Sequence, residues 1–349
     1  MAENRFHISS SPHFTFGSST QKIMLAVLIS LLPQVIAGTV VFGPSALLTV
    51  LVSVCGAVGF EALFQKITGQ KIVIKNLSAA VTGVLLALVL PSTVPLWIVL
   101  LGDAVAVIIA KGLFGGIGSN VFNPALTGRA VLVISFPAVL GARWFDPVLA
   151  KTNEAVSNFD AVTSATLLSS VKHGNTDAFN FVNYFLGNRA GCIGETSILL
   201  ILISFLFLLV TKIIDWRAPV AMIITVALGT FFSGLGKGIN AAAYDVLIAL
   251  LSGGLLFGAT FMVTDYATTP VTRPGRLVFG FGCGLITFLI RKFGGYPEGV
   301  MFSILIMNAI APHLNNLTTR MYGYGKKGNM RADVNKINAE FGLSEGEQK

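Results

Sequence analysis

The chain has 349 residues, of which 54% are hydrophobic and only 11% are charged, and its formal net charge is +8. Charged residues make up about a quarter of an ordinary soluble domain, so this composition excludes a soluble globular protein and indicates an integral membrane protein. The basic residues are scattered between apolar stretches and form no single face, which argues against nucleic acid as a partner.

Apolar stretches long enough to cross a hydrocarbon core of about 30 Å recur along the chain. We expect each to form a helix, because backbone groups that face lipid must be hydrogen-bonded within their own segment. The fold class is therefore an all-α integral membrane protein with about ten transmembrane helices. These predicted helices cover residues 23–41, 44–64, 76–91, 95–114, 122–141, 196–214, 217–235, 242–263, 277–293 and 299–314.

Lys and Arg are concentrated in alternate connecting segments, which by the positive-inside rule are cytoplasmic. This asymmetry predicts a cytoplasmic N-terminal segment, residues 1–22, and a cytoplasmic tail, residues 315–349. Helices 1–5 then occupy residues 23–141 and helices 6–10 occupy residues 196–314. The long polar interval between them, residues 142–195, is predicted to lie outside the cytoplasm.

Five helices on each side of an outward loop make the second half enter the membrane from the opposite face, so the halves are predicted to be inverted repeats. Internal similarity supports this: Lys111-Gly-Leu-Phe-Gly-Gly resembles Arg291-Lys-Phe-Gly-Gly, and the two are followed by Asn123 and Asn308. The Gly-Gly breaks predict half-helices whose ends face a buried site. Chance similarity in a glycine-rich apolar chain is the alternative.

Ionisable side chains inside membrane helices are costly, so each is a candidate for function. Asp103, Glu195, Asp265 and Glu298 are our candidates for coupling to ion movement; mutual neutralisation between neighbouring helices is the alternative. Threonine hydroxyls flank Asp265, and such oxygen-rich groups suit a hard cation or the polar edge of a flavin. They equally suit the cap of a helix end.

The segment from Phe114 to Ala130 is too rich in glycine and polar residues for a plain lipid-facing helix. Its glycines allow the backbone to approach a flat ligand closely, and the amides of Asn120 and Asn123 supply donors and acceptors. The spacing of a phosphate-binding loop is absent.

The three cysteines, Cys55, Cys192 and Cys283, are far apart and form no Cys-x-x-Cys pair. We expect no disulfide framework and no metal site built by this chain alone, and interpret them as small apolar fillers. An iron site shared with a partner protein is the alternative.

The central polar interval contains Phe-Asp-Ala-Val-Thr-Ser-Ala-Thr-Leu-Leu at residues 159–168. Asp160 precedes three hydroxyl residues, Thr163, Ser164 and Thr166, which a modifying enzyme could reach. By composition alone this would be an ordinary Ser/Thr turn.

Several stretches together resemble the RnfD family of the Rnf electron-transport complex, which is related to the NqrB component of the Na⁺-translocating NADH:quinone oxidoreductase. They follow the family's order over nearly the whole chain. The stretches are Lys-Gly-Leu-Phe-Gly-Gly-Ile-Gly-Ser-Asn-Val-Phe-Asn-Pro-Ala-Leu (111–126), Asp-Ala-Val-Thr-Ser-Ala-Thr-Leu-Leu (160–168), Gly-Glu-Thr-Ser (194–197), Gly-Ala-Thr-Phe-Met-Val-Thr-Asp (258–265) and Gly-Gly-Tyr-Pro-Glu-Gly-Val-Met-Phe (294–302).

The resemblance implies a covalent flavin mononucleotide (FMN) whose phosphate is esterified to the last Thr of a Ser/Thr-Gly-Ala-Thr motif, here Thr166. Asp160, Thr163 and Ser164 would complete the attachment site. Ser164 stands where the family often has Gly, and Leu167 where Pro is common. The resemblance also implies a flavin transferase for maturation, partner subunits that handle reduced ferredoxin and NAD, and a place in the bacterial cytoplasmic (inner) membrane.

The sequence thus predicts a membrane component of an ion-translocating ferredoxin:NAD⁺ oxidoreductase, a translocase in which this chain is not catalytic alone. It would relay electrons through covalent FMN and couple this to Na⁺ or H⁺ movement. A second, non-covalent flavin, riboflavin or FMN, near Asn120 or Asp265 stays open. The alternatives are a secondary transporter or channel without redox chemistry, and a structural membrane scaffold.

Overall fold

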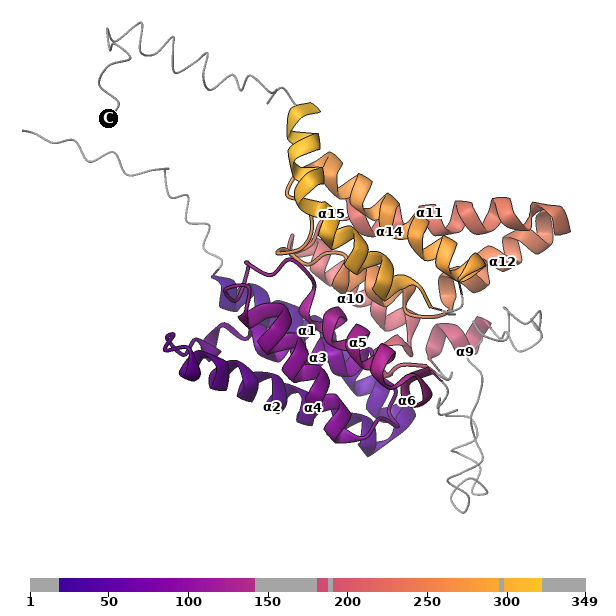
Figure 1. Ribbon diagram of the computed structural model, residues 1–349. Coiled ribbons are helices and arrows are strands. Elements are labelled where there is room, and N and C mark those ends of the chain that lie inside the picture. Colours follow the sequence, from indigo (N-terminus) through magenta and orange to yellow (C-terminus); the bar gives the residue numbers. More distant parts are fainter. Residues whose placement is uncertain (1–18, 142–180, 188–190, 295–297, 322–349) are drawn as a thin grey trace, which may run out of the picture.

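The computed structural model describes residues 19–141, 181–187, 191–294 and 298–321, and every regular element in these ranges is helical. The helices of the first half lie together at the bottom of Figure 1, and most of those of the second half lie above them. The first half comprises α1 (Thr20–Phe42), α2 (Pro44–Ile67), η1 (Ile74–Asn76), α3 (Ser78–Leu88), α4 (Leu96–Ala104), the π-helix η2 (Val105–Gly112), α5 (Pro124–Ser135) and α6 (Pro137–Gly141).

The second half begins after the short helix α9 (Phe181–Leu186) and the 3₁₀ turn η4 (Ile193–Glu195). It comprises α10 (Ile198–Val210), α11 (Arg217–Gly234), η5 (Leu235–Lys237), α12 (Ile239–Leu251), α13 (Leu255–Phe257), the π-helix η6 (Gly258–Met262), α14 (Arg273–Phe293) and α15 (Val300–Met321). Each apolar stretch expected to span the membrane holds one of these helices or a run of consecutive ones.

Four of the described helices are long and apolar enough to cross a membrane: α1, α2, α11 and the Val300–Thr318 part of α15. A fifth span results if α12 and the Leu255–Met262 helix are taken together, although the two are bent by 59° at their break. The apolar helices α3, α5 and α10 are shorter. The 59° bend interrupts the predicted helix 242–263, away from the Gly-Gly pairs at which half-helices were expected. The apolar helices make the chain a membrane protein.

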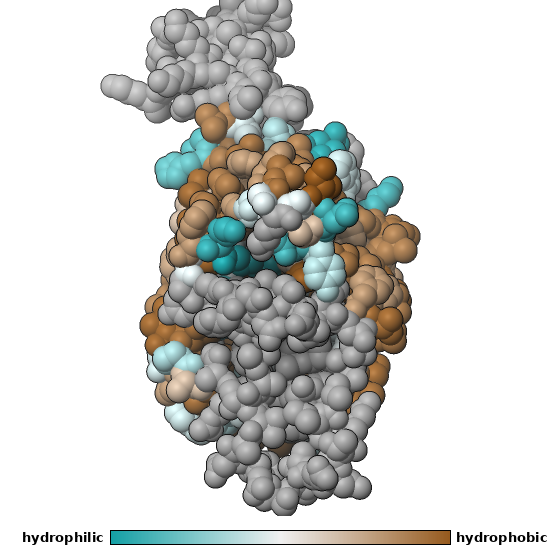
Figure 2. Space-filling view, turned by 90° about the vertical axis from the view of Figure 1, so that its right-hand side faces the viewer, coloured by the Kyte–Doolittle hydropathy of each residue, from teal (hydrophilic) through white to brown (hydrophobic). Residues whose placement is uncertain are grey.

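The outer surface of the helices is apolar, as lipid requires. Val40, Val210 and Phe293 have exposed fractions of 76%, 73% and 76%. The flanks of the molecule in Figure 2 are largely brown for the same reason. In water such an exposed apolar surface would promote aggregation, whereas contact with lipid acyl chains carries no such penalty.

The interior is packed through glycines that let helix backbones approach closely. A Cβ on Gly280 would lie 2.2 Å from the carbonyl oxygen of Ala218, and one on Gly284 would lie 2.6 Å from that of Met222. Both contacts join α14 to α11. In a membrane the lipid is as apolar as the side chains, so helices associate through close packing, which small residues at the interface allow.

The connection between α10 and α11 holds a charged cluster. Oδ2 of Asp215 accepts hydrogen bonds of 2.8 Å from Nη1 of Arg217 and from Nη1 of Arg276 on α14. Burial opposes ionisation of this carboxyl, but the backbone N–H of Arg217 and the two guanidinium groups together lower the pKa of Asp215. The side chain is therefore ionised at neutral pH.

Replacing Gly280 with Ala should destabilise the protein by about 1–3 kcal/mol, because the added methyl group has to force α14 and α11 apart. Gly59→Ala is the matched control, since a Cβ on Gly59 of α2 meets nothing within 4 Å. Thermal unfolding in detergent should show a lower midpoint for the first variant only. Equal midpoints would contradict the close packing of these helices.

Candidate functional site

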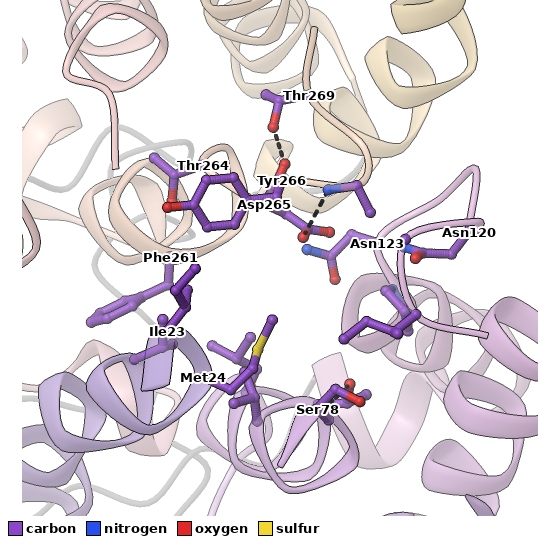
Figure 3. Close-up of a pocket in the computed structure, with 18 of the residues that line it drawn as sticks. Ile23, Met24, Ser78, Asn120, Asn123, Phe261, Thr264, Asp265, Tyr266 and Thr269 are labelled. Atoms are coloured by element: carbon purple, nitrogen blue, oxygen red, sulfur yellow. Dashed lines mark hydrogen bonds between the residues drawn. The ribbon is translucent and has the colours of Figure 1, made fainter. Parts of the chain in front are cut away.

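A cavity of about 610 Å³ lies between the two halves of the chain. Its size falls in the range of about 300–1,000 Å³ that is usual for small-molecule sites. Figure 3 shows Asn120 and Asn123 on one side of the opening, and Thr264, Asp265 and Tyr266 on another. Three residues predicted from the sequence, Asn120, Asn123 and Asp265, therefore come together here.

Asn123 belongs to the loop that follows the π-helix η2, and it caps α5. Its Oδ1 accepts a hydrogen bond of 3.3 Å from the backbone N–H of Leu126. Asn120 is held by a bond of 3.1 Å from its Nδ2 to the carbonyl oxygen of Phe122. These bonds fix how both amides are turned. Among the described residues, neither Nδ2 of Asn123 nor Oδ1 of Asn120 has a hydrogen-bond partner, so one donor and one acceptor remain for a ligand.

Asp265 belongs to the loop that follows the other π-helix, η6. Its carboxylate accepts hydrogen bonds from the backbone N–H of Ala267 at 3.4 Å and from the hydroxyl of Thr268 at 3.1 Å, and its carbonyl oxygen accepts from the hydroxyl of Thr269. The hydroxyl of Thr264 instead donates to the carbonyl oxygen of Thr260. The hydroxyls of Thr268 and Thr269 thus shape the turn that places Asp265 in the cavity wall.

The buried side chain of Asn308 on α15 joins the two loops. Its Oδ1 accepts a hydrogen bond of 3.2 Å from the backbone N–H of Asn123, and its Nδ2 donates to the carbonyl oxygen of Thr268 at 3.2 Å. One amide therefore holds the loop that carries Asn123 and the loop that carries Asp265. The internal similarity that paired Asn123 with Asn308 in the sequence corresponds to a direct contact.

Lys111 and Glu61 form a buried ion pair that no sequence pattern predicted. Nζ of Lys111 donates to Oε1 of Glu61 and to Oγ of Ser78, both at 2.6 Å. Lys111 and Ser78 line the cavity. The acid and the base are 50 residues apart in the chain, so their contact appears only in the fold.

A second polar cluster contains Glu195 and Glu298. Oε2 of Glu298 lies 2.7 Å from Nη2 of Arg129 on α5, and Oε1 accepts from the backbone N–H of Gly254 at 3.3 Å. A Cβ on Gly254 would lie 2.3 Å from Oε1 of Glu195 and 2.8 Å from Oε1 of Glu298. The two carboxylates therefore meet at Gly254, which only a residue without a side chain allows.

This acidic cluster is separate from the cavity. None of Arg129, Glu195 and Glu298 is among the residues that line the cavity. Arg291 lies close by and donates to the carbonyl oxygens of Ala249 at 2.6 Å and Ser252 at 3.3 Å, at the end of α12. The partner of Glu298, Arg129, is a residue whose role the sequence did not reveal.

The remaining predicted residues lie elsewhere. Asp103 is fully buried on α4, apart from both clusters. Thr166, Asp160, Thr163 and Ser164 fall outside the described residues, so their predicted role in flavin attachment stays a prediction.

Comparison with known proteins gives a consistent result. A family model described as the NQR2, RnfD, RnfE family matches residues 7–323. The chain is 40% identical over 330 residues to the D subunit of the Na⁺-translocating ferredoxin:NAD⁺ oxidoreductase complex of Acetobacterium woodii, covering 93% of this chain and 98% of that protein.

Two further relatives carry related names. The D subunit of the proton-translocating ferredoxin:NAD⁺ oxidoreductase complex of Clostridium ljungdahlii is 40% identical over 90% of this chain and 95% of its own length. The D subunit of the ion-translocating oxidoreductase complex of Stutzerimonas stutzeri is 37% identical over 89% of this chain and 94% of its own length.

Replacing either Arg129 or Glu298 with Met should lower stability by about 3 kcal/mol, because each change leaves the opposite charge buried without its partner. The double replacement should recover most of that loss, since it removes both charges. Thermal unfolding of the three variants measures the coupling. If the stability losses of the two single variants simply add in the double variant, Arg129 and Glu298 do not stabilise each other.

Proposed function

Because this chain belongs to the NQR2, RnfD, RnfE family, we propose that it is the D subunit of an ion-translocating ferredoxin:NAD⁺ oxidoreductase of the Rnf type. The observation that carries the proposal is similarity along almost the full length of relatives bearing that name. The protein would be part of an oxidoreductase and translocase, with the other Rnf subunits as its partners.

We propose that the ten helical units form two inverted five-helix repeats. Pairs of helices in corresponding places support this, since α1 contacts α10 and α5 contacts α15. Within each half the second helix packs on the third and fourth, as α2 does on α3 and α4, and α11 on α12 and α14. The two π-helices do not correspond under this relation, since η2 lies in the fourth unit of the first half and η6 in the third unit of the second half. A two-fold axis between the halves accounts for the helix contacts.

The proposed place of the chain is the bacterial cytoplasmic (inner) membrane, with both termini and the cavity on the cytoplasmic side. The helix ends and connections on the side of the cavity carry basic residues, in keeping with the positive-inside rule: Lys22, Lys75, Lys212, Arg217 and Arg276. Residues 142–195 would then lie on the opposite side.

The proposed covalent cofactor is FMN on Thr166, attached by a flavin transferase. A phosphate dianion is stable in an aqueous loop and costly in hydrocarbon, so the predicted outward position of residues 142–195 suits it. A covalent tether would also keep the cofactor from being lost to the medium. Asp160, Thr163 and Ser164 would surround the attachment point.

The cavity suits a second flavin, riboflavin or FMN, held without a covalent bond. A flavin has a flat apolar ring system with one edge of alternating donors and acceptors. Asn123 and Asn120 present a donor and an acceptor that have no hydrogen-bond partner among the described residues. Apolar side chains such as Met24 and Phe261 line the rest of the cavity, where they would cover the ring faces. Bound there, a flavin would supply electron-transfer chemistry, while Lys111 and Asp265 set the charge around it.

Coupling of electron flow to Na⁺ or H⁺ movement is assigned to Asp265, Glu195, Glu298 and Asp103. Moving one charge against 100 mV costs about 2.3 kcal/mol, so ionisable groups within the membrane are where such work can be done. Asp265 is the first candidate because it lies in the wall of the proposed flavin cavity.

A transporter or channel without redox chemistry would also have broken helices and intramembrane acids. The names of the relatives, all components of oxidoreductase complexes, favour the electron carrier. The same names leave a purely structural scaffold without support.

Denaturing the purified protein should separate the two flavins. The flavin on Thr166 should stay with the chain and fluoresce in a gel, whereas the flavin of the cavity should be released into the supernatant. Thr166→Ala should abolish the first signal only, and Asn120→Ala should reduce the second only. Thr152→Ala, a threonine of the interval 142–195 outside the attachment motif, is the control. If the protein is made in cells that contain the flavin transferase and its band still shows no flavin fluorescence, a transporter or channel without redox chemistry is favoured.

Asp265→Asn should impair ion uptake into vesicles more than it lowers the covalent flavin content. Asn keeps an oxygen that can accept from the backbone N–H of Ala267, so the change removes the charge and spares the turn. Ion uptake and in-gel flavin fluorescence are measured on the same preparations. Unchanged uptake would remove Asp265 from the coupling residues.

A further inference from the structure

Asp103 is an acid buried inside the first half of the molecule. It lies on α4, which packs against α2, α3 and α5, and its exposed fraction is 0%. The residue that meets it is Ser53 of α2, also with an exposed fraction of 0%. This place is distinct from the cavity and from the Glu195–Glu298 cluster.

The hydroxyl of Ser53 lies between two oxygen atoms. Its Oγ is 2.8 Å from the carbonyl oxygen of Gly83 on α3 and 2.8 Å from Oδ1 of Asp103. A hydroxyl carries one hydrogen, and the carbonyl can only accept. Two full hydrogen bonds therefore require that Ser53 donates to Gly83 and that Asp103 donates to Ser53. Only a protonated carboxyl can donate.

The charges around Asp103 favour the same state. Among the described residues Asp103 forms no ion pair, and α3 carries no charged side chain. Two cations of neighbouring elements are engaged, because Lys111 pairs with Glu61 and Arg129 pairs with Glu298. A third, the exposed Lys66, lies thirteen residues from Ser53 on α2, or about 20 Å along the helix. Glu61 lies eight residues from Ser53 on α2, or about 12 Å along the helix.

The second carboxyl oxygen of Asp103 points to the same conclusion. Oδ2 is buried and has no hydrogen-bond partner in the described part of the chain. It lies against Gly56 of α2, where a Cβ would come within 3.0 Å of it. A carboxylate would place half of its negative charge on this bare oxygen, which is costly away from water. The carbonyl oxygen of a carboxylic acid is far less costly there.

We propose that Asp103, Ser53 and the carbonyl group of Gly83 form a proton-binding site in which Asp103 is a carboxylic acid at neutral pH. The ligand is a proton taken from water, bound to Oδ1. When Asp103 releases this proton, the hydroxyl of Ser53 would rotate and donate to Oδ1 of Asp103 and no longer to the carbonyl oxygen of Gly83. The direction of the Ser53 hydrogen bond would therefore change with the protonation of Asp103.

A metal cation fits this place poorly. Hard cations in proteins take about six oxygen ligands, whereas the polar groups here are those of Ser53, Gly83 and Asp103 itself. The inference holds whether or not the chain carries flavin, so its failure would leave the proposed electron-carrier function untouched.

Infrared spectroscopy of the purified complex in lipid tests the site. A protonated carboxyl has a C=O stretching band that a carboxylate lacks. Asp103→Asn should remove the intensity of one protonated carboxyl at neutral pH. Asp215→Asn is the matched control and should remove none, because the lowered pKa of Asp215 keeps it ionised. Equal protonated-carboxyl bands in wild type and Asp103→Asn would overturn the proposal.

Ser53→Ala gives a second test that keeps the acid in place. Without its acceptor, the O–H group of Asp103 loses its hydrogen bond, so the band should shift to higher wavenumber. An unshifted band would contradict the hydrogen-bond chain. Adding Na⁺ at constant pH should leave the wild-type band unchanged, and its loss on Na⁺ addition would show that a cation, not a proton, is the ligand.

Discussion

The hydrogen bonds of the Asn308 side chain hold together the two loops from which the cavity is made. One side of this amide accepts from the backbone of Asn123, and the other donates to the backbone of Thr268. A buried hydrogen bond adds only about 1 kcal/mol net, but a buried group left without its partner costs about 1–3 kcal/mol. The loops are thus fixed less by the strength of these bonds than by the cost of breaking them. This link therefore holds the loops of Asn123 and Asp265 against the same cavity.

The same cost governs the charges inside the molecule. Lys111 of η2 pairs with Glu61 of α2 at 2.6 Å, and Arg129 of α5 pairs at 2.7 Å with Glu298 in the segment before α15. A buried charge is tolerated when it is neutralised and hydrogen-bonded. Asp103 lacks such a cation among the described residues, and neutralisation by a proton is the remaining physical solution. Among the described residues the interior therefore contains two ion pairs, and for Asp103 we propose neutralisation by a proton.

The sequence predicted the helices well because each coincides with a run of apolar residues. It did not predict where they break: Pro33 and Pro312 lie inside continuous helices, and the 59° bend lies between Leu251 and Leu255. It also selected Asn120, Asn123 and Asp265 as candidates, since polar residues in apolar segments are few, and the structure places all three in the wall of one cavity. It could not predict the pairing of Lys111 with Glu61 or of Arg129 with Glu298. Partners on different helices depend on how those helices pack, which is determined by close contacts such as that of Gly280 with α11 and not by any local pattern.

The identity of the transported ion is decided by local chemistry and not by overall similarity. A relative named for Na⁺ and a relative named for protons are each 40% identical to this chain, so the average resemblance carries no information about the ion. What distinguishes the two ions is the number of oxygens around a binding site. A proton needs one acceptor, whereas a hard cation needs about six ligands. Asp103, with Ser53 and Gly83 as its polar neighbours, is built for the smaller requirement. If this acid takes part in coupling, the ion it handles is a proton.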